Sequence, residues 1–100
     1  MKIKEQHDAN MLANMLANFK LMFSVACIRM EGFNERAEKE RIWDVYVRSA
    51  LDGCFMLGAI SCRQYNDLKD LKDVVIDLIE KRNIKGAYYL RNCILDRNED

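Results

Sequence analysis

Apolar residues recur along most of this chain at the three- and four-residue spacing of amphipathic helices. The first such segment covers residues 8–31, and its stripe consists of Met11, Leu12, Met15, Leu16, Phe19, Met22, Phe23, Ala26 and Met30. Gly32 follows and is expected to end the helix in a left-handed conformation. A second apolar strip on another side of this helix contains Leu21, Val25 and Ile28. It predicts that the C-terminal half of the helix is buried on two sides, as a central helix or an oligomer contact.

A second helix is predicted over residues 34–57, with Asn34 as its N-cap. Its apolar stripe is expected to be buried and consists of Trp43, Tyr46, Val47, Ala50, Cys54 and Leu57. The dipeptide Asp52-Gly53 lies inside this pattern and either ends the helix early or marks close packing against a neighbour. We favour close packing.

Gly58 is expected to close the second helix, and a strong start signal follows it. Ser61 and Gln64 have the spacing of a capping box, in which each side chain bonds the backbone of the other residue. A third helix is therefore predicted over residues 61–82, with an apolar seam at heptad spacing that contains Leu68, Leu71, Val75 and Leu78. Asn83 is placed to cap a short fourth helix over residues 84–95.

The chain contains no proline and only four glycines, which favours long uninterrupted helices. Its 100 residues suit one hydrophobic core, so we expect a single domain over residues 1–100. Loops as short as those between the predicted helices require neighbouring helices to run antiparallel. The predicted fold is all-α: a compact antiparallel bundle of three long helices plus a short C-terminal helix.

The charges are balanced, with 16 Lys and Arg residues against 16 Asp and Glu residues. This balance supplies neither the basic surface that DNA or RNA backbones require nor a polybasic membrane patch. The apolar run from Met11 to Met30 is interrupted by polar residues such as Asn14 and Lys20, so a membrane-spanning segment and a signal peptide are not expected. We expect a cytoplasmic protein that does not bind nucleic acid directly.

Candidate chemistry is sparse. The four cysteines, Cys27, Cys54, Cys62 and Cys93, lack the spacing of a zinc site, and three of them lie on apolar helical faces. We expect free thiols without a bound metal. His7 is the only imidazole and precedes the first apolar turn, where a mobile side chain makes a poor general base. The sequence therefore predicts a protein that is not an enzyme and that has no cofactor, catalytic residue or metal site.

Two charged clusters are candidates for a binding surface. An acidic strip is predicted along the third helix, opposite its apolar seam, and consists of Asp67, Asp70, Asp73 and Asp77. It is either a solvated face, a Mg²⁺ or Ca²⁺ site lacking further ligands, or a docking strip for a basic protein that handles nucleic acid. A basic cluster near the end of this helix either stabilises the helix dipole or binds phosphate or an acidic partner, and consists of Lys81, Arg82, Lys85 and Arg91.

The sequence Met-Leu-Ala-Asn occurs twice in tandem, at residues 11–14 and 15–18. The repeat places alanines in one helical row and asparagines in another, so it is either a coincidence on a solvated edge or a contact with another helix. Because the first helix has more apolar surface than a monomer covers, we predict a homodimer or an obligatory partner. The predicted contact consists of Ala13, Met15, Ala17, Phe19 and Met22.

The segment 57–61, Leu-Gly-Ala-Ile-Ser, resembles the turn of the helix-turn-helix family, with the small Cys54 four residues before the glycine. That family places apolar residues six and nine positions after the glycine, where this chain has Gln64 and Asp67. The resemblance implies a DNA-binding transcription regulator, which is one alternative. The helix after this turn, which would read the DNA, is rich in acidic residues, and this argues against contact with phosphates.

The leading hypothesis is a non-enzymatic protein–protein interaction module that regulates or inhibits a larger protein or protein complex. In size and plain composition the chain is similar to the small host-takeover and anti-defence proteins that phages encode. This is a likeness of class, so it implies no residue roles. Besides the helix-turn-helix regulator, the other alternative is a purely structural subunit of a helical dimer.

Overall fold

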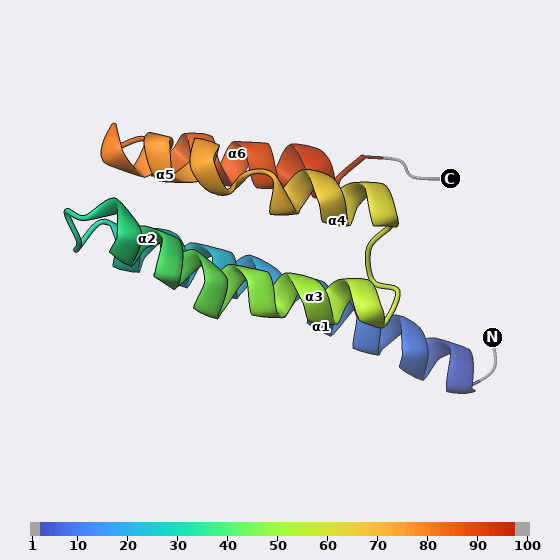
Figure 1. The fold of residues 1–100 in the computed structure, drawn as a ribbon. Coiled ribbons are helices and arrows are strands. Elements are labelled where there is room, and N and C mark those ends of the chain that lie inside the picture. The colour runs from blue at the N-terminus through green and yellow to red at the C-terminus, as the bar shows by residue number, and fades with distance from the viewer. Residues whose placement is uncertain (1–2, 98–100) are drawn as a thin grey trace.

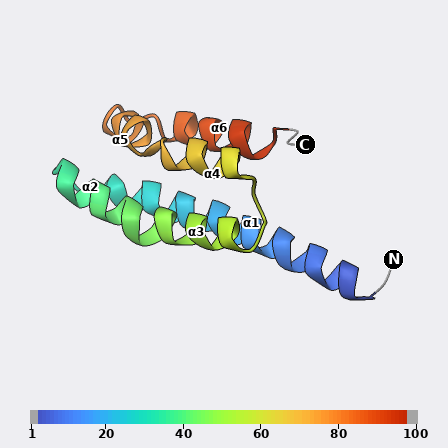
Figure 2. The same cartoon turned by 45° about the vertical axis from the view of Figure 1, so that its right-hand side comes forward.

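The computed structural model describes the backbone of residues 3–97 and the side chains of residues 8–97. The regular structure of this part of the chain is entirely helical, as predicted. Two layers of helices are stacked (Figures 1 and 2). One layer contains α1 (Ile3–Met30) beside a long second helix made of α2 (Arg36–Ile42), η1 (Trp43–Arg48) and α3 (Ser49–Met56). The other contains α4 (Cys62–Lys69), α5 (Lys72–Glu80) and α6 (Ile84–Leu95).

The second helix continues without interruption from Arg36 to Met56, although its middle part η1 is a wider π-helix. The Ser49 hydroxyl donates to the Asp44 carbonyl oxygen, five residues earlier, at 3.3 Å. The predicted N-cap is wrong, because Glu35 occupies the cap position and no side chain bonds the first turn. Asn34 lies one residue too early to cap.

The predicted third helix is divided into two short helices. Between α4 and α5 the Leu71 amide bonds the Leu68 carbonyl oxygen only three residues back, at 3.2 Å, which marks a tight turn. The core side of α5 is formed by Val75, Ile76 and Ile79, and not by the heptad positions alone. The described part of the chain therefore has two long helices, and the predicted arrangement with three is not confirmed.

Several predicted helix boundaries are confirmed. Gly58 has a φ of 79°, a left-handed conformation that ends α3 at little cost for glycine. Both bonds of the capping box between Ser61 and Gln64 are present, and Asn83 caps α6. The prediction for Gly32 is wrong: α1 ends nearby, but Gly58 is the only described glycine with a positive φ.

The core is centred on the C-terminal half of α1. The Phe23 ring makes edge-on contacts with Phe19 and Trp43, with ring centroids 6.1 and 5.9 Å away, and it is fully buried. The second strip on α1 is not buried as a whole, because Leu21 and Ile28 are 57% and 60% exposed, whereas Val25 is partly buried. Within the chain α1 is therefore covered on one side, and the prediction of a central helix is wrong.

The N-terminal turns of α1 extend beyond the end of the second helix (Figure 1). This projection contributes to an elongated shape with extents of 50 × 22 × 19 Å. Ala9, Asn10 and Met11 are exposed there. The start of the apolar stripe thus lies outside the core.

Candidate protein-binding surfaces

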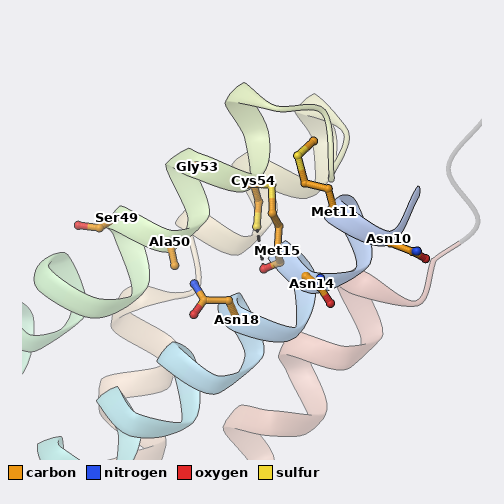
Figure 3. A pocket seen from close by; sticks show the side chains of 9 residues that line it. All are labelled: Asn10, Met11, Asn14, Met15, Asn18, Ser49, Ala50, Gly53 and Cys54. Carbon is orange, nitrogen blue, oxygen red and sulfur yellow. Dashed lines mark hydrogen bonds between the residues drawn. The ribbon is translucent and has the colours of Figure 1, made fainter. Parts of the chain in front are cut away.

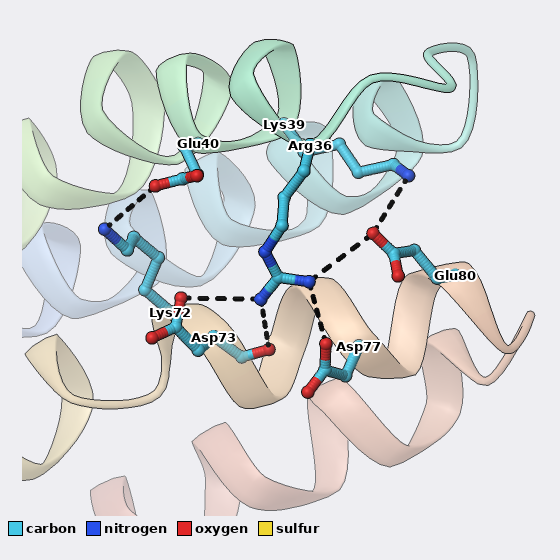
Figure 4. A network of polar contacts seen from close by, with 7 residues as sticks. All are labelled: Arg36, Lys39, Glu40, Lys72, Asp73, Asp77 and Glu80. Atoms are coloured by element: carbon cyan, nitrogen blue, oxygen red, sulfur yellow. Dashed lines mark hydrogen bonds and ion pairs between the residues drawn. The ribbon is translucent and has the colours of Figure 1, made fainter.

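Arg36, the first residue of α2, joins the two helical layers (Figure 4). Its guanidinium lies 2.8 Å from a carboxylate oxygen of Asp77, and 3.5 Å from carboxylate oxygens of both Asp73 and Glu80. These contacts raise the pKa of Arg36, led by the hydrogen bond to Asp77. Lys39, which is buried, makes a further ion pair with Glu80 at 3.4 Å. The two residues of the acidic strip that lie on α5, Asp73 and Asp77, therefore share Arg36 as an intramolecular partner.

The acidic strip is not continuous. The turn between α4 and α5 separates Asp67 and Asp70 from Asp73 and Asp77. Asp67 pairs with Arg97 at 2.8 Å, whereas Asp70 is exposed at the end of α4. The Asp73 side chain keeps 73% of its surface exposed despite its contact with Arg36. Binding of a basic partner by these aspartates therefore stays a prediction, and Asp70 and Asp73 are both exposed.

The predicted basic cluster of four residues is wrong. Lys81, Arg82 and Lys85 are exposed around the turn from α5 to α6, but Arg91 is only 8% exposed. Its guanidinium lies over the rings of Phe23 and Tyr88, at 5.2 and 5.1 Å. Burial lowers the pKa of Arg91. Arg91 therefore belongs to the interior contact between α6 and α1.

The segment that resembles a helix-turn-helix has structural contacts at its unusual positions. Gln64 is buried, and its amide donates to the carbonyl oxygens of Ile94 and Leu95 at the end of α6, at 3.2 and 3.4 Å. Asp67 makes the ion pair with Arg97. These polar residues thus satisfy groups of the second layer where the family has apolar packing. Nothing in this geometry favours DNA binding.

The junction of α3 and α4 is held by a polar cluster of three side chains. The Tyr65 hydroxyl donates to the Asp52 carboxylate at 2.6 Å, and Arg48 donates to the same oxygen at 3.1 Å. The hydrogen bond from Tyr65, followed by that from Arg48, lowers the pKa of Asp52. The Tyr65 ring also stacks on Phe55 at 4.5 Å. The cluster fixes the end of α3 relative to α4.

The described side chains offer little for catalysis. Residues 8–97 contain no group of three or more His, Cys, Asp or Glu side chains placed to hold a metal ion. His7 lies outside the described side chains. Burial raises the pKa of the Cys27 thiol to about 12, which keeps it protonated and unreactive. The absence of enzymatic activity stays a prediction.

Only two of the four cysteines are buried, not the three expected on apolar faces: Cys27 and Cys54 are buried, and Cys62 and Cys93 are exposed. All four are free. We therefore expect alkylation of the native protein to add two labels quickly, and alkylation after denaturation to add four. Intact mass spectrometry measures both numbers. Rapid addition of four labels to the native protein would contradict the buried positions of Cys27 and Cys54.

A groove of about 640 Å³ lies between the N-terminal half of α1 and α3 (Figure 3). We call it the α1–α3 groove; it is lined by Asn10, Met11, Asn14, Met15, Asn18, Ser49, Ala50, Gly53 and Cys54. A Cβ atom added to Gly53 would meet no atom of the protein within 4 Å. The prediction that Gly53 marks close packing is therefore wrong within one chain. Its missing side chain leaves the groove open.

The predicted oligomer-contact residues fall into two groups. Ala13 and Ala17 are exposed, and Met15 and Met22 are partly exposed, so all four are within reach of a partner. Phe19 is buried in the core and offers no surface, which corrects that part of the prediction. The contact itself stays a prediction.

An apolar tip at the end of α3 was not predicted. Phe55, Met56 and Leu57 are 38%, 81% and 58% exposed, and Leu57 had been assigned to the buried stripe. The signal was present in the sequence, because one side of a helix cannot bury three consecutive apolar residues. We refer to these three residues as the apolar tip.

The segment Asp8–Met30 of α1 is long and apolar enough to cross a membrane, although it also supplies core residues of the bundle. The same test is passed by core helices of soluble proteins and by signal sequences, so it does not establish a location. Comparison with known proteins identified no similar family model, curated protein or solved structure.

Proposed function

We propose that this chain is a non-enzymatic binding protein that docks on a larger protein or complex and regulates or inhibits it. The observation that carries the proposal is the apolar tip, with Met56 at 81% exposure and both of its neighbours exposed. Single exposed apolar side chains are common on soluble proteins, whereas a contiguous exposed group is typical of a partner site.

The surroundings of the tip suit a docking role because they are rigid. Phe55 stacks on Tyr65, and Tyr65 is fixed by its bond to Asp52. A binding surface that is already ordered loses less conformational entropy when its partner docks. Aromatic and methionine side chains are also enriched at the centres of protein interfaces. The tip therefore combines suitable residue types with a fixed position.

The proposal is tested by capturing partners on the tagged full-length protein in an extract of the cells that produce it. We expect Met56→Glu to abolish capture of the partner, because the charge must be desolvated at the centre of an apolar contact. Val45→Glu is the matched control, since Val45 is 58% exposed on η1, outside the tip. The captured proteins are identified and quantified by mass spectrometry.

Two outcomes would contradict the proposal: capture of no protein in stoichiometric amount, or equal capture by the wild type and Met56→Glu. The double variant Asp70→Lys/Asp73→Lys shows in the same experiment whether the acidic residues contribute. A basic partner surface predicts weaker capture by this variant and by the wild type at high salt, where exposed charge pairs are screened. Unchanged capture assigns the aspartates to the solvated surface.

A further inference from the structure

The α1–α3 groove differs in character from the rest of the surface because no charged residue lines it. Its α1 wall contains three asparagines and two methionines, and its α3 wall contains only small residues (Figure 3). Asn10, Asn14 and Asn18 make no side-chain hydrogen bond to any other described residue, so their amides remain available. A complementary occupant therefore needs apolar surface together with uncharged hydrogen-bonding groups.

The outer side of α1 has the same character. The outward faces of helices in soluble proteins normally carry charged residues. Between Ala9 and Ile28 this helix has a single charged residue, Lys20, whose carbonyl oxygen accepts a bond from Arg91 on the α6 side. The exposed row opposite the core is entirely uncharged and contains Asn10, Asn14, Ala17, Leu21 and Ile28. An apolar, uncharged helix thus borders an apolar, uncharged groove.

We infer that the occupant of the α1–α3 groove is a second copy of this chain, whose α1 lies antiparallel to the first. In such a twofold contact a residue on the axis meets its own copy, so a charge at that position would face an equal charge. A neutral patch avoids this repulsion. The amide of asparagine both donates and accepts hydrogen bonds, and it therefore pairs with an identical amide across a twofold axis.

The spacing of the asparagines defines the register. Asn10 and Asn18 are each four residues from Asn14, so an axis at Asn14 places Asn10 opposite Asn18 of the partner subunit and Asn14 opposite its own copy. Buried asparagines fix register and oligomeric state in this way in coiled coils. On the α3 side of the groove, Ala50 and Gly53 leave room for α1 of the other protomer. Each α1 then contacts α1 and α3 of the other protomer.

The decisive variants introduce charge at Asn14. We expect the wild type to have twice the 11.8 kDa mass of one chain in multi-angle light scattering at micromolar concentrations. Asn14→Asp and Asn14→Lys should each be monomeric, because two like charges meet at the axis. An equimolar mixture of the two should recover the dimer, because unlike charges then meet. Asn66→Asp is the matched control, at an exposed position on α4, and should remain dimeric.

Three results would overturn the inference. One is a monomeric wild type throughout this concentration range. Another is a failure of the mixed Asp and Lys variants to associate while each retains the helical content of the wild type by circular dichroism. The third is flotation of the wild type with neutral phospholipid vesicles, since a bilayer would then be what covers α1. Gly53→Leu, which fills the groove, should also weaken the dimer without unfolding the chain.

Discussion

Replacement of Phe23 by alanine is expected to lower the free energy of unfolding by about 3–5 kcal/mol, the usual cost of truncating a buried phenylalanine. Phe23 is fully buried, and it contacts Phe19 on its own helix, Trp43 on η1 and Tyr88 on α6. Truncation removes these ring contacts and leaves a cavity where the two helical layers meet. The loss is measured by urea denaturation, monitored by the fluorescence of Trp43, the only tryptophan.

Leu21→Ala is the matched control because Leu21 is two residues away but more than half exposed. With both variants made in the Asn14→Asp background, where no second copy covers the outer side of α1, we expect this change to alter the free energy of unfolding by less than about 0.5 kcal/mol. Equal losses for the two variants would mean that both sides of α1 are covered. The comparison therefore tests directly which face of the helix forms the core.

The sequence pattern predicted the helical composition and most boundaries because those signals are local. Ser61, Gln64 and Asn83 act on backbone groups within one turn, and all three make the predicted bonds. The break after α4 has no such local signal, since neither Asp70 nor Leu71 is a residue that ends helices. It lies where α5 turns Val75 and Ile76 toward the core, which is decided by packing against distant helices.

The exposure of the second strip on α1 has a related explanation. Periodicity shows which residues share a helix face, but not whether a second helix covers that face. Leu21 and Ile28 share a face as predicted, and no helix of the same chain covers them. What occupies that face depends on molecules outside the chain, which the pattern of one sequence does not identify.

The charged clusters were predicted less well because their partners are distant in sequence. Asp73 and Asp77 both contact Arg36, which lies about 40 positions earlier along the chain. Arg91 was grouped with three exposed cations by its position near a helix end. Its side chain instead crosses to α1. Spacing along one helix does not reveal ion pairs or stacking between helices.

Replacement of Arg91 by alanine is expected to lower the free energy of unfolding by about 2–3 kcal/mol, although arginine on a helix surface contributes little. One guanidinium nitrogen donates to the Lys20 carbonyl oxygen at 3.2 Å and to the Ser24 hydroxyl at 3.4 Å. The same group lies over the rings of Phe23 and Tyr88, where cation–π attraction is strengthened by burial. Alanine loses all of these contacts, and those with Lys20, Ser24 and Phe23 join α6 to α1.

Two further variants separate the charge of Arg91 from its packing. Arg91→Met keeps an unbranched apolar stem against the two rings and removes a buried cation that makes no ion pair with any described residue. We therefore expect methionine to recover at least half of the stability that alanine loses. Arg63→Ala on the exposed side of α4 should change the free energy of unfolding by less than about 0.5 kcal/mol. All three variants are measured by urea denaturation with Trp43 fluorescence. If Arg91→Ala is as stable as Arg63→Ala, Arg91 lies on the surface with the other basic residues.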